Sequence, residues 1–174
     1  MEQDQGRDNR LRHQLGALQS GNRSAILAAL REIRHTGSVA VLPELFELLM
    51  DQEDQQIASE ITGLLNDLKE QKAARVLVAA IDNPDYGQIS SLLIAACWQN
   101  GLSYDQYTDT FVRMAIRGDY ATAIEAFTVI EEAAGNLAQE ERHRLAGMIN
   151  DGLQAADEQK RILLKELIRV ITMY

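Results

Sequence analysis

Apolar residues recur at a spacing of three and four along most of the chain, and no stretch alternates at period two over a useful length. The first such stripe, Leu11, Leu15 and Leu18, predicts a helix over about 7–19. Similar stripes follow up to the last residues. They predict helices over about 23–35, 41–49, 53–68, 72–81, 85–100, 103–117, 120–134, 137–154 and from 157 onward. The pattern therefore predicts an all-α protein of about ten helices.

Polar and turn-forming residues separate these stripes at positions that suit helix ends. Asn22, Asp119 and Asp157 are predicted N-caps, and Gly37 is predicted to end the helix over 23–35. Pro43 is tolerated only in the first turn of a helix, so the next helix is predicted to begin near Val41. Three further helix starts are predicted from the cap-like sequences Asn83-Pro84-Asp85, Ser103-Tyr104-Asp105-Gln106 and Asn136 with Gln139.

A unit of two helices, 31 to 36 residues long, recurs about four times after residue 20. One helical hairpin cannot bury its apolar face alone, so the repeats are predicted to stack on one another. We predict one domain over 1–174. It comprises an N-terminal cap helix in 1–21, helical pairs in 22–50, 51–82, 83–118 and 119–154, and a C-terminal helix in 155–174 with Ile162, Leu163, Leu167, Ile168 and Ile171 facing inward.

The residues of the first pair resemble HEAT repeats, in particular the short bacterial variety. Arg23 to Leu30 is similar to the first-helix pattern of that family, and Val41 to Leu49, followed by Asp51, resembles its second helix with the family's proline. Asn83-Pro84-Asp85 looks like the turn between repeats, whereas the later repeats lack the second-helix proline. The resemblance implies a right-handed α-α superhelix of about four to five helical pairs whose second helices line the concave side. It carries over no catalytic residue.

The formal charge of -9 and the pI near 4.8 argue against nucleic-acid binding, because such binding depends on clustered Lys and Arg. Acidic residues are concentrated in 36–70, which holds eight of them and one lysine. The N-terminus lacks an apolar signal-like region, and no stretch of about 18 apolar residues occurs, so we expect a cytoplasmic protein that does not enter a membrane. Cys97 is the single cysteine, which excludes an internal disulfide.

Residues with catalytic or metal-binding chemistry are sparse. His13, His35 and His143 fall on different predicted helices and are predicted to be surface residues, so no metal site is indicated. Cys97 lies among apolar residues and is predicted to be buried rather than nucleophilic. No glycine-rich phosphate loop precedes Lys-Ser or Lys-Thr. We therefore expect no enzyme activity and no cofactor.

Two candidate binding surfaces stand out. Glu44 and Glu47, one helical turn apart, adjoin Asp51, Glu53 and Asp54, which together would either bind a basic partner or form a solvated surface. Six of the nine aromatic residues lie within 35 positions, and they would either anchor a partner or fill a bulky core: Tyr86, Trp98, Tyr104, Tyr107, Phe111 and Tyr120. The candidate binding residues are Glu44, Glu47, Tyr104, Tyr107, Asp109 and Arg113.

These features predict a non-enzymatic scaffold or adaptor that binds a protein or peptide, with basic residues, on the concave surface. The resemblance also permits a lyase-like or chaperone-like role that assists cofactor attachment, as in HEAT-related phycobilin lyases. It permits, too, a DNA glycosylase of similar helical build, which would need a basic groove. Self-association through the terminal helix, Leu163 to Tyr174, is a third alternative.

Overall fold

The computed structural model describes residues 2–36, 38–51 and 53–174, and the side chains of these ranges from residue 5 onward. Every regular element in these ranges is helical, as predicted, with ten α-helices and three short 3-10 segments. Gly37, the predicted helix stop, and Gln52, in the turn between the first two predicted pairs, lie outside the described residues. Backbone contacts divide the chain into two compact units, Met1–Ile89 (unit 1) and Ser90–Tyr174 (unit 2).

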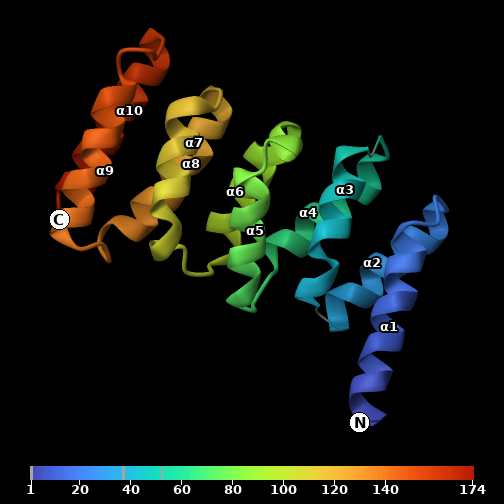
Figure 1. Cartoon of the computed structure of the whole chain (residues 1–174). Helices are drawn as coiled ribbons and strands as arrows, with labels where there is room; N and C mark the ends of the chain where they lie inside the picture. Colours follow the sequence, from blue (N-terminus) through green and yellow to red (C-terminus); the bar gives the residue numbers. More distant parts are fainter. Residues whose placement is uncertain (1, 37, 52) are drawn as a thin grey trace. The chain divides into compact units, whose positions relative to one another are not determined.

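Unit 1 contains five α-helices. In chain order they are α1 (Glu2–Leu18), α2 (Arg23–Thr36), α3 (Leu42–Met50), α4 (Gln55–Asn66) and α5 (Lys72–Asp82), with 3-10 segments η1 (Val39–Val41) and η2 (Pro84–Ile89). Helix α1 packs on α2 and α3, α2 packs on α4, and α3 packs on α5 (Figure 1). The largest fully buried side chains of this unit are Leu30, Leu42, Leu45, Phe46, Ile61, Leu65 and Leu77.

The helix starts of unit 1 follow the sequence signals closely. Asn22 Oδ1 accepts a hydrogen bond from the backbone N–H of Ala25 at 3.0 Å, which confirms the predicted cap of α2. Pro43 lies in the first turn of α3, and Val41 is its N-cap residue. Asp54 caps α4 by accepting from the N–H groups of Gln56 and Ile57. These residues mark where α2, α3 and α4 begin.

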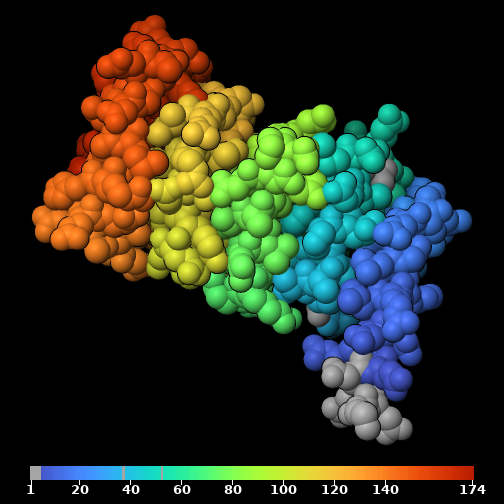
Figure 2. All heavy atoms as spheres, in the orientation of Figure 1, coloured from blue at the N-terminus to red at the C-terminus, as the bar shows by residue number. Residues whose placement is uncertain are grey.

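Unit 2 contains five more α-helices. They are α6 (Ser90–Asn100), α7 (Thr108–Arg117), α8 (Tyr120–Ala134), α9 (Gln139–Gly152) and α10 (Glu158–Thr172), with the 3-10 segment η3 (Asp105–Tyr107). Helix α8 packs against α6, α7 and α10, while α9 packs against α7 and α10. Side chains fill the spaces between neighbouring helices within each unit (Figure 2). Asp119 and Asp157 cap α8 and α10, as predicted.

Three predicted helix starts are displaced in the structure. Asn83 accepts from the N–H of Asp85 at 3.0 Å, but the segment that follows is the 3-10 helix η2, and α6 begins only at Ser90. The helix predicted from Ser103 begins as η3 and becomes α-helical at Thr108. The N-cap of α9 is Ala138, which makes no side-chain cap bond, and the amide N–H of Asn136 donates to Asp105.

The inward face of α10 also differs from the prediction. Ile162 is 67% exposed, and the buried residues are Lys160, Leu164, Leu167, Val170 and Ile171. The reason is that the Lys160 ammonium donates to the backbone carbonyls of Ile116 and Gly118, which turns Lys160 inward and Ile162 outward. Most of the apolar face of the terminal helix is therefore covered within unit 2.

Candidate functional site

The acidic residues of α3 open onto a hollow of about 360 Å³ in unit 1, which we call the acidic hollow. It is formed where the end of α1 and the starts of α2 and α4 meet the second half of α3. Its polar lining includes Glu44, Glu47, Asp51, Asp54 and Arg23, so four carboxylates face one guanidinium. Its apolar lining consists of Leu18, Ile26, Leu48 and Ile57. The hollow thus combines an apolar floor with a net negative rim.

Local sequence explains why these carboxylates point outward. Pro43 fixes the first turn of α3, and the buried residues Leu42, Leu45, Phe46 and Leu49 define its inward stripe. Glu44 and Glu47 lie between these positions and face away from the core; Glu44 is half-buried and Glu47 exposed. Gly21 lines the acidic hollow between α1 and α2. Its positive φ of 65° lets the chain turn sharply from α1 into α2.

Two carboxylates of the hollow already hold neutral donors. Glu44 accepts a hydrogen bond from the Gln19 amide at 3.0 Å, and Glu47 accepts one from the Tyr86 hydroxyl at 2.5 Å. The bond to Glu47, together with burial, raises the pKa of Tyr86 to about 12. Neither donor is charged, so neither of these hydrogen bonds is an ion pair.

Asp54 has a structural role at the hollow's edge. It caps α4 and accepts from Arg23 Nε at 2.5 Å, and these bonds, that of Arg23 first, hold its pKa below the ordinary value. Asp51 is exposed and has no ion-pair partner among the residues that the structure describes. The carboxylates of the hollow that have no basic ion-pair partner among the described residues are therefore those of Glu44, Glu47 and Asp51.

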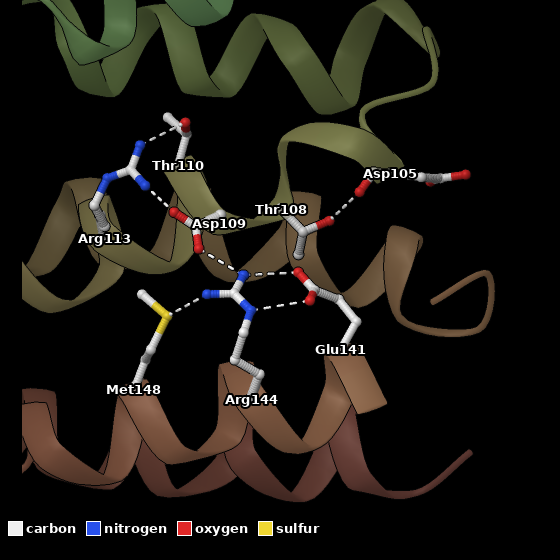
Figure 3. Close-up of polar contacts among 8 residues, drawn as sticks. All are labelled: Asp105, Thr108, Asp109, Thr110, Arg113, Glu141, Arg144 and Met148. Carbon is white, nitrogen blue, oxygen red and sulfur yellow. Dashed lines mark hydrogen bonds and ion pairs between the residues drawn. The ribbon is translucent and has the colours of Figure 1, made fainter. Parts of the chain in front are cut away.

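The candidate residues Asp109 and Arg113 lie in unit 2 and form part of a closed ion-pair network (Figure 3). Asp109 pairs with Arg113 one turn along α7 and accepts from Arg144 of α9 at 2.6 Å. Arg144 also contacts Glu141 at 2.7 Å, which lowers the pKa of that carboxyl. Each charge in the network thus faces an opposite charge, so the network joins α7 to α9 and offers no free carboxylate.

The aromatic candidates separate into core and surface residues. Tyr104 is only 4% exposed, its ring meets Phe111 edge-on at 5.6 Å, and its hydroxyl bonds to Asn100. Tyr104 is therefore a core residue, so it cannot anchor a partner at the surface. Tyr107 is half-buried at the end of η3. Trp98 and Tyr120 are partly exposed, and the Trp98 indole N–H donates to Glu125 at 2.8 Å.

The structure also shows the environment of the cysteine and the histidines. Cys97 is buried, which raises the pKa of its thiol to about 12 and makes it a poor nucleophile. The three histidines are exposed, as predicted. In the described part of the chain no group of three or more His, Cys, Asp or Glu side chains could hold a metal ion. Nor does any helix within the described ranges have the length and apolar character needed to cross a membrane.

Sequence reasoning missed several residues that shape the acidic hollow. Gln19, Arg23 and Leu48 line it, although only the acidic residues stood out in the sequence. Arg23 could have been found, because it follows a predicted cap and so lies at a helix start. Glu53, by contrast, belongs to the predicted acidic cluster but is not part of the lining.

Comparison of the chain with protein-family models, with curated proteins and with solved structures finds no match.

Proposed function

We propose that the protein is a non-enzymatic interaction module of the cytoplasm that binds a basic peptide or protein segment in the acidic hollow of unit 1. The observation that supports this most is that one open hollow combines an apolar floor with carboxylates that have no basic partner among the described residues. Lys and Arg carry an aliphatic stem below a cationic head. One such side chain can cover Ile26 and Leu48 while its charge meets Glu44 or Glu47.

We further propose that the helices form a HEAT-like α-solenoid. Within unit 1, α2 packs on α4 and α3 on α5; within unit 2, α6 packs on α8, α8 on α10 and α7 on α9. Packing between alternate helices is typical of two-layered helical repeats. In such a solenoid α3, the second helix of the first pair, would belong to the concave layer, where repeat proteins commonly bind their partners.

Binding of a synthetic peptide tests the site. A fluorescent peptide in which leucines alternate with lysines should bind the wild-type chain, and its affinity should fall as salt is added, since exposed charges are screened. The double variant Glu44→Lys, Glu47→Lys should bind at least about tenfold more weakly, because two attractive charges become repulsive. Fluorescence anisotropy measures both effects.

The control is a double variant that changes the net charge by the same amount but at positions outside the acidic hollow. Glu140→Lys with Asp151→Lys alters two exposed acidic residues of α9 by the same charge and should leave binding nearly unchanged. Equal binding by both double variants would show that net charge attracts the peptide and would contradict the proposed site. Capture of partners from the native cell with the wild-type chain and the Glu44, Glu47 variant, followed by mass spectrometry, then identifies the partner.

A further inference from the structure

A second hollow in unit 1 is lined by arginines, in contrast to the acidic hollow. It has a volume of about 270 Å³ and lies between the middle of α1, the end of α2 and the residue before η1. This volume is just below the range of about 300–1,000 Å³ that is typical of small-molecule sites, so the hollow suits a small ligand. We call it the arginine hollow, and its lining consists of Arg7, Asp8, Arg10, Leu11, Gln14, Thr36 and Ser38.

The two arginines of this lining have no acidic partner. Arg7 and Arg10 lie three positions apart in α1, so their side chains leave the same face of the helix. Both are exposed, and neither forms an ion pair within the described ranges. Asp8, the one carboxylate that the described lining contains, lies about 160° around the helix from Arg10 and therefore at the edge of this face. The lining thus carries one net positive charge and favours an anion.

Hydrogen bonds already occupy two other polar residues of the hollow. Gln14 is only 2% exposed, and its amide donates to the carboxylate of Glu32 at 3.3 Å and to the hydroxyl of Thr36 at 3.1 Å. The Thr36 hydroxyl in turn donates to the backbone carbonyl of Glu32, which is not part of the lining. The Ser38 hydroxyl, by contrast, makes no hydrogen bond in the described part of the chain. The donors left for a ligand are therefore two guanidinium groups and this hydroxyl.

From this set of donors we propose that the arginine hollow binds a phosphate group. The oxygens of a phosphate point in different directions, so Arg7, Arg10 and Ser38 can each donate to a different one. Two arginines also match the charge of about -2 that a phosphate group carries near neutral pH. A carboxylate has two oxygens in one plane, and a single bidentate guanidinium satisfies it.

The phosphate group belongs either to free phosphate or to a small phosphate monoester. Leu11 is half-buried in the lining and offers an apolar contact to the carbon chain of an ester. The site is separate from the acidic hollow, because the two linings share no residue. Its test is therefore independent of the basic partner proposed for the acidic hollow.

NMR titration of the full isotope-labelled chain with inorganic phosphate tests the site. At low ionic strength the Ser38 amide and the side-chain N–H groups of Arg7 and Arg10 should shift in a saturable way, with a dissociation constant of about 1 mM. Acetate should bind more weakly, because it can engage only one of the two arginines. Ethyl phosphate should show which source the hollow accepts: tighter binding than inorganic phosphate identifies a monoester lying against Leu11, and equal binding identifies free phosphate.

Charge-neutral variants locate the site on α1. Arg7→Gln and Arg10→Gln should each weaken phosphate binding by about tenfold, since each removes a charge-assisted contact. Arg12→Gln is the matched control, because Arg12 is an exposed arginine of the same helix that does not line the hollow, and it should bind phosphate like the wild type. Asp8→Asn should strengthen binding, because it removes the carboxylate at the edge of the site.

Three results would overturn the proposal. One is the absence of a saturable shift up to about 20 mM phosphate. Another is equal weakening by Arg10→Gln and Arg12→Gln, which would show that phosphate responds only to the net charge of the helix. The third is acetate binding as tight as phosphate binding. Circular dichroism of each variant should match the wild type, since Arg7, Arg10 and Arg12 are all exposed.

Discussion

One ammonium group, that of Lys160, connects three helix ends in unit 2. Lys160 is only 8% exposed, and its Nζ donates to the carbonyls of Ile116 and Gly118 at 2.6 and 2.5 Å. These carbonyls lie at the C-terminal end of α7, where the helix dipole favours a cation. Asp119 and Asp157, the caps of α8 and α10, act on the same ammonium, although burial outweighs them and lowers the pKa of Lys160. The side chain thus fixes α10 against the end of α7.

Replacing Lys160 by methionine should therefore destabilise the protein. Lys160→Met keeps an aliphatic side chain of similar length but leaves two carbonyls without their donor, at a cost of about 1–3 kcal/mol in the free energy of unfolding. Urea unfolding followed by circular dichroism measures this change. Lys165→Met, at an exposed position of the same helix, should change stability by less than about 0.5 kcal/mol. Equal effects of the two variants would contradict the role assigned to Lys160.

Individual residues differ in how well the sequence predicts their role. The caps Asn22, Asp119 and Asp157 are predictable because their bonds reach only three residues along the chain. Lys160 is not, because its acceptors lie more than forty residues away and a lysine is normally expected at the surface. Tyr104 was predicted either to anchor a partner or to fill a bulky core, and its ring packs on Phe111 in the core. Aromatic composition alone does not distinguish these two environments.

At the level of helices, the end of α9 approaches α7 closely because Gly152 has no side chain. A β-carbon on Gly152 would lie 2.7 Å from Cγ2 of Ile116, well inside van der Waals contact. Gly147, five residues earlier in the same helix, has no neighbour within 4 Å of such a β-carbon among the described residues. The two glycines of α9 therefore offer an internal comparison between packing and helix propensity.

Alanine substitutions at these glycines should have opposite effects. Gly152→Ala should lower stability by about 1–3 kcal/mol, because Ile116 is β-branched and can give way only if α7 or α9 shifts. Gly147→Ala should raise stability by up to about 1 kcal/mol, because alanine is the better helix former and the site is open. Thermal unfolding of the two variants and of the wild type measures both changes in stability. Stabilisation by both would show that α9 and α7 can separate at this point without cost.

Most helix positions follow from periodicity, and the exceptions have a local cause. Helix α8 spans the predicted 120–134, because a cap at Asp119 and a helix stop at Gly135 bracket one regular apolar stripe. The segments 84–89 and 105–107 were predicted as α-helical but are 3-10 turns. The two helix types share side-chain signals at their starts and differ by one residue in their hydrogen-bond spacing, so the sequence pattern does not separate them.

The candidate site was predictable in part. Glu44 and Glu47 were found because they are one turn apart and acidic, and they do face outward from α3. Arg113 and Asp109 were also found, but their mutual ion pair, extended by Arg144, leaves no free charge. The hollow itself required tertiary structure, since Leu18, Ile26 and Ile57 come from three helices and each appears in the sequence as an ordinary core residue.

Charge is the property that most distinguishes the chain as a whole. Acidic residues outnumber basic ones in both units, and the formal net charge is -9. Self-repulsion of this kind destabilises a compact state at neutral pH and is screened by salt. Several carboxylates nevertheless contribute to stability, because hydrogen bonds hold their pKa values below the ordinary 3.8 and 4.5. They are Asp54 with Arg23, Asp119 with the Thr122 N–H, Glu141 with Arg144 and Glu166 with Arg169.

Stability should therefore pass through a maximum on the acidic side of neutrality. Lowering the pH from 8 toward the pI near 4.8 reduces the excess negative charge, so the melting temperature should rise slightly. Below about pH 4 the melting temperature should fall steeply, because the unfolded chain binds protons at ordinary pKa values while the bonded carboxylates resist protonation. Scanning calorimetry between about pH 3 and pH 8, in about 20 mM and about 200 mM salt, separates the two effects, since salt mainly removes the repulsion among exposed charges. A melting temperature that stays constant down to pH 3 would show that these bonded carboxylates do not stabilise the folded state.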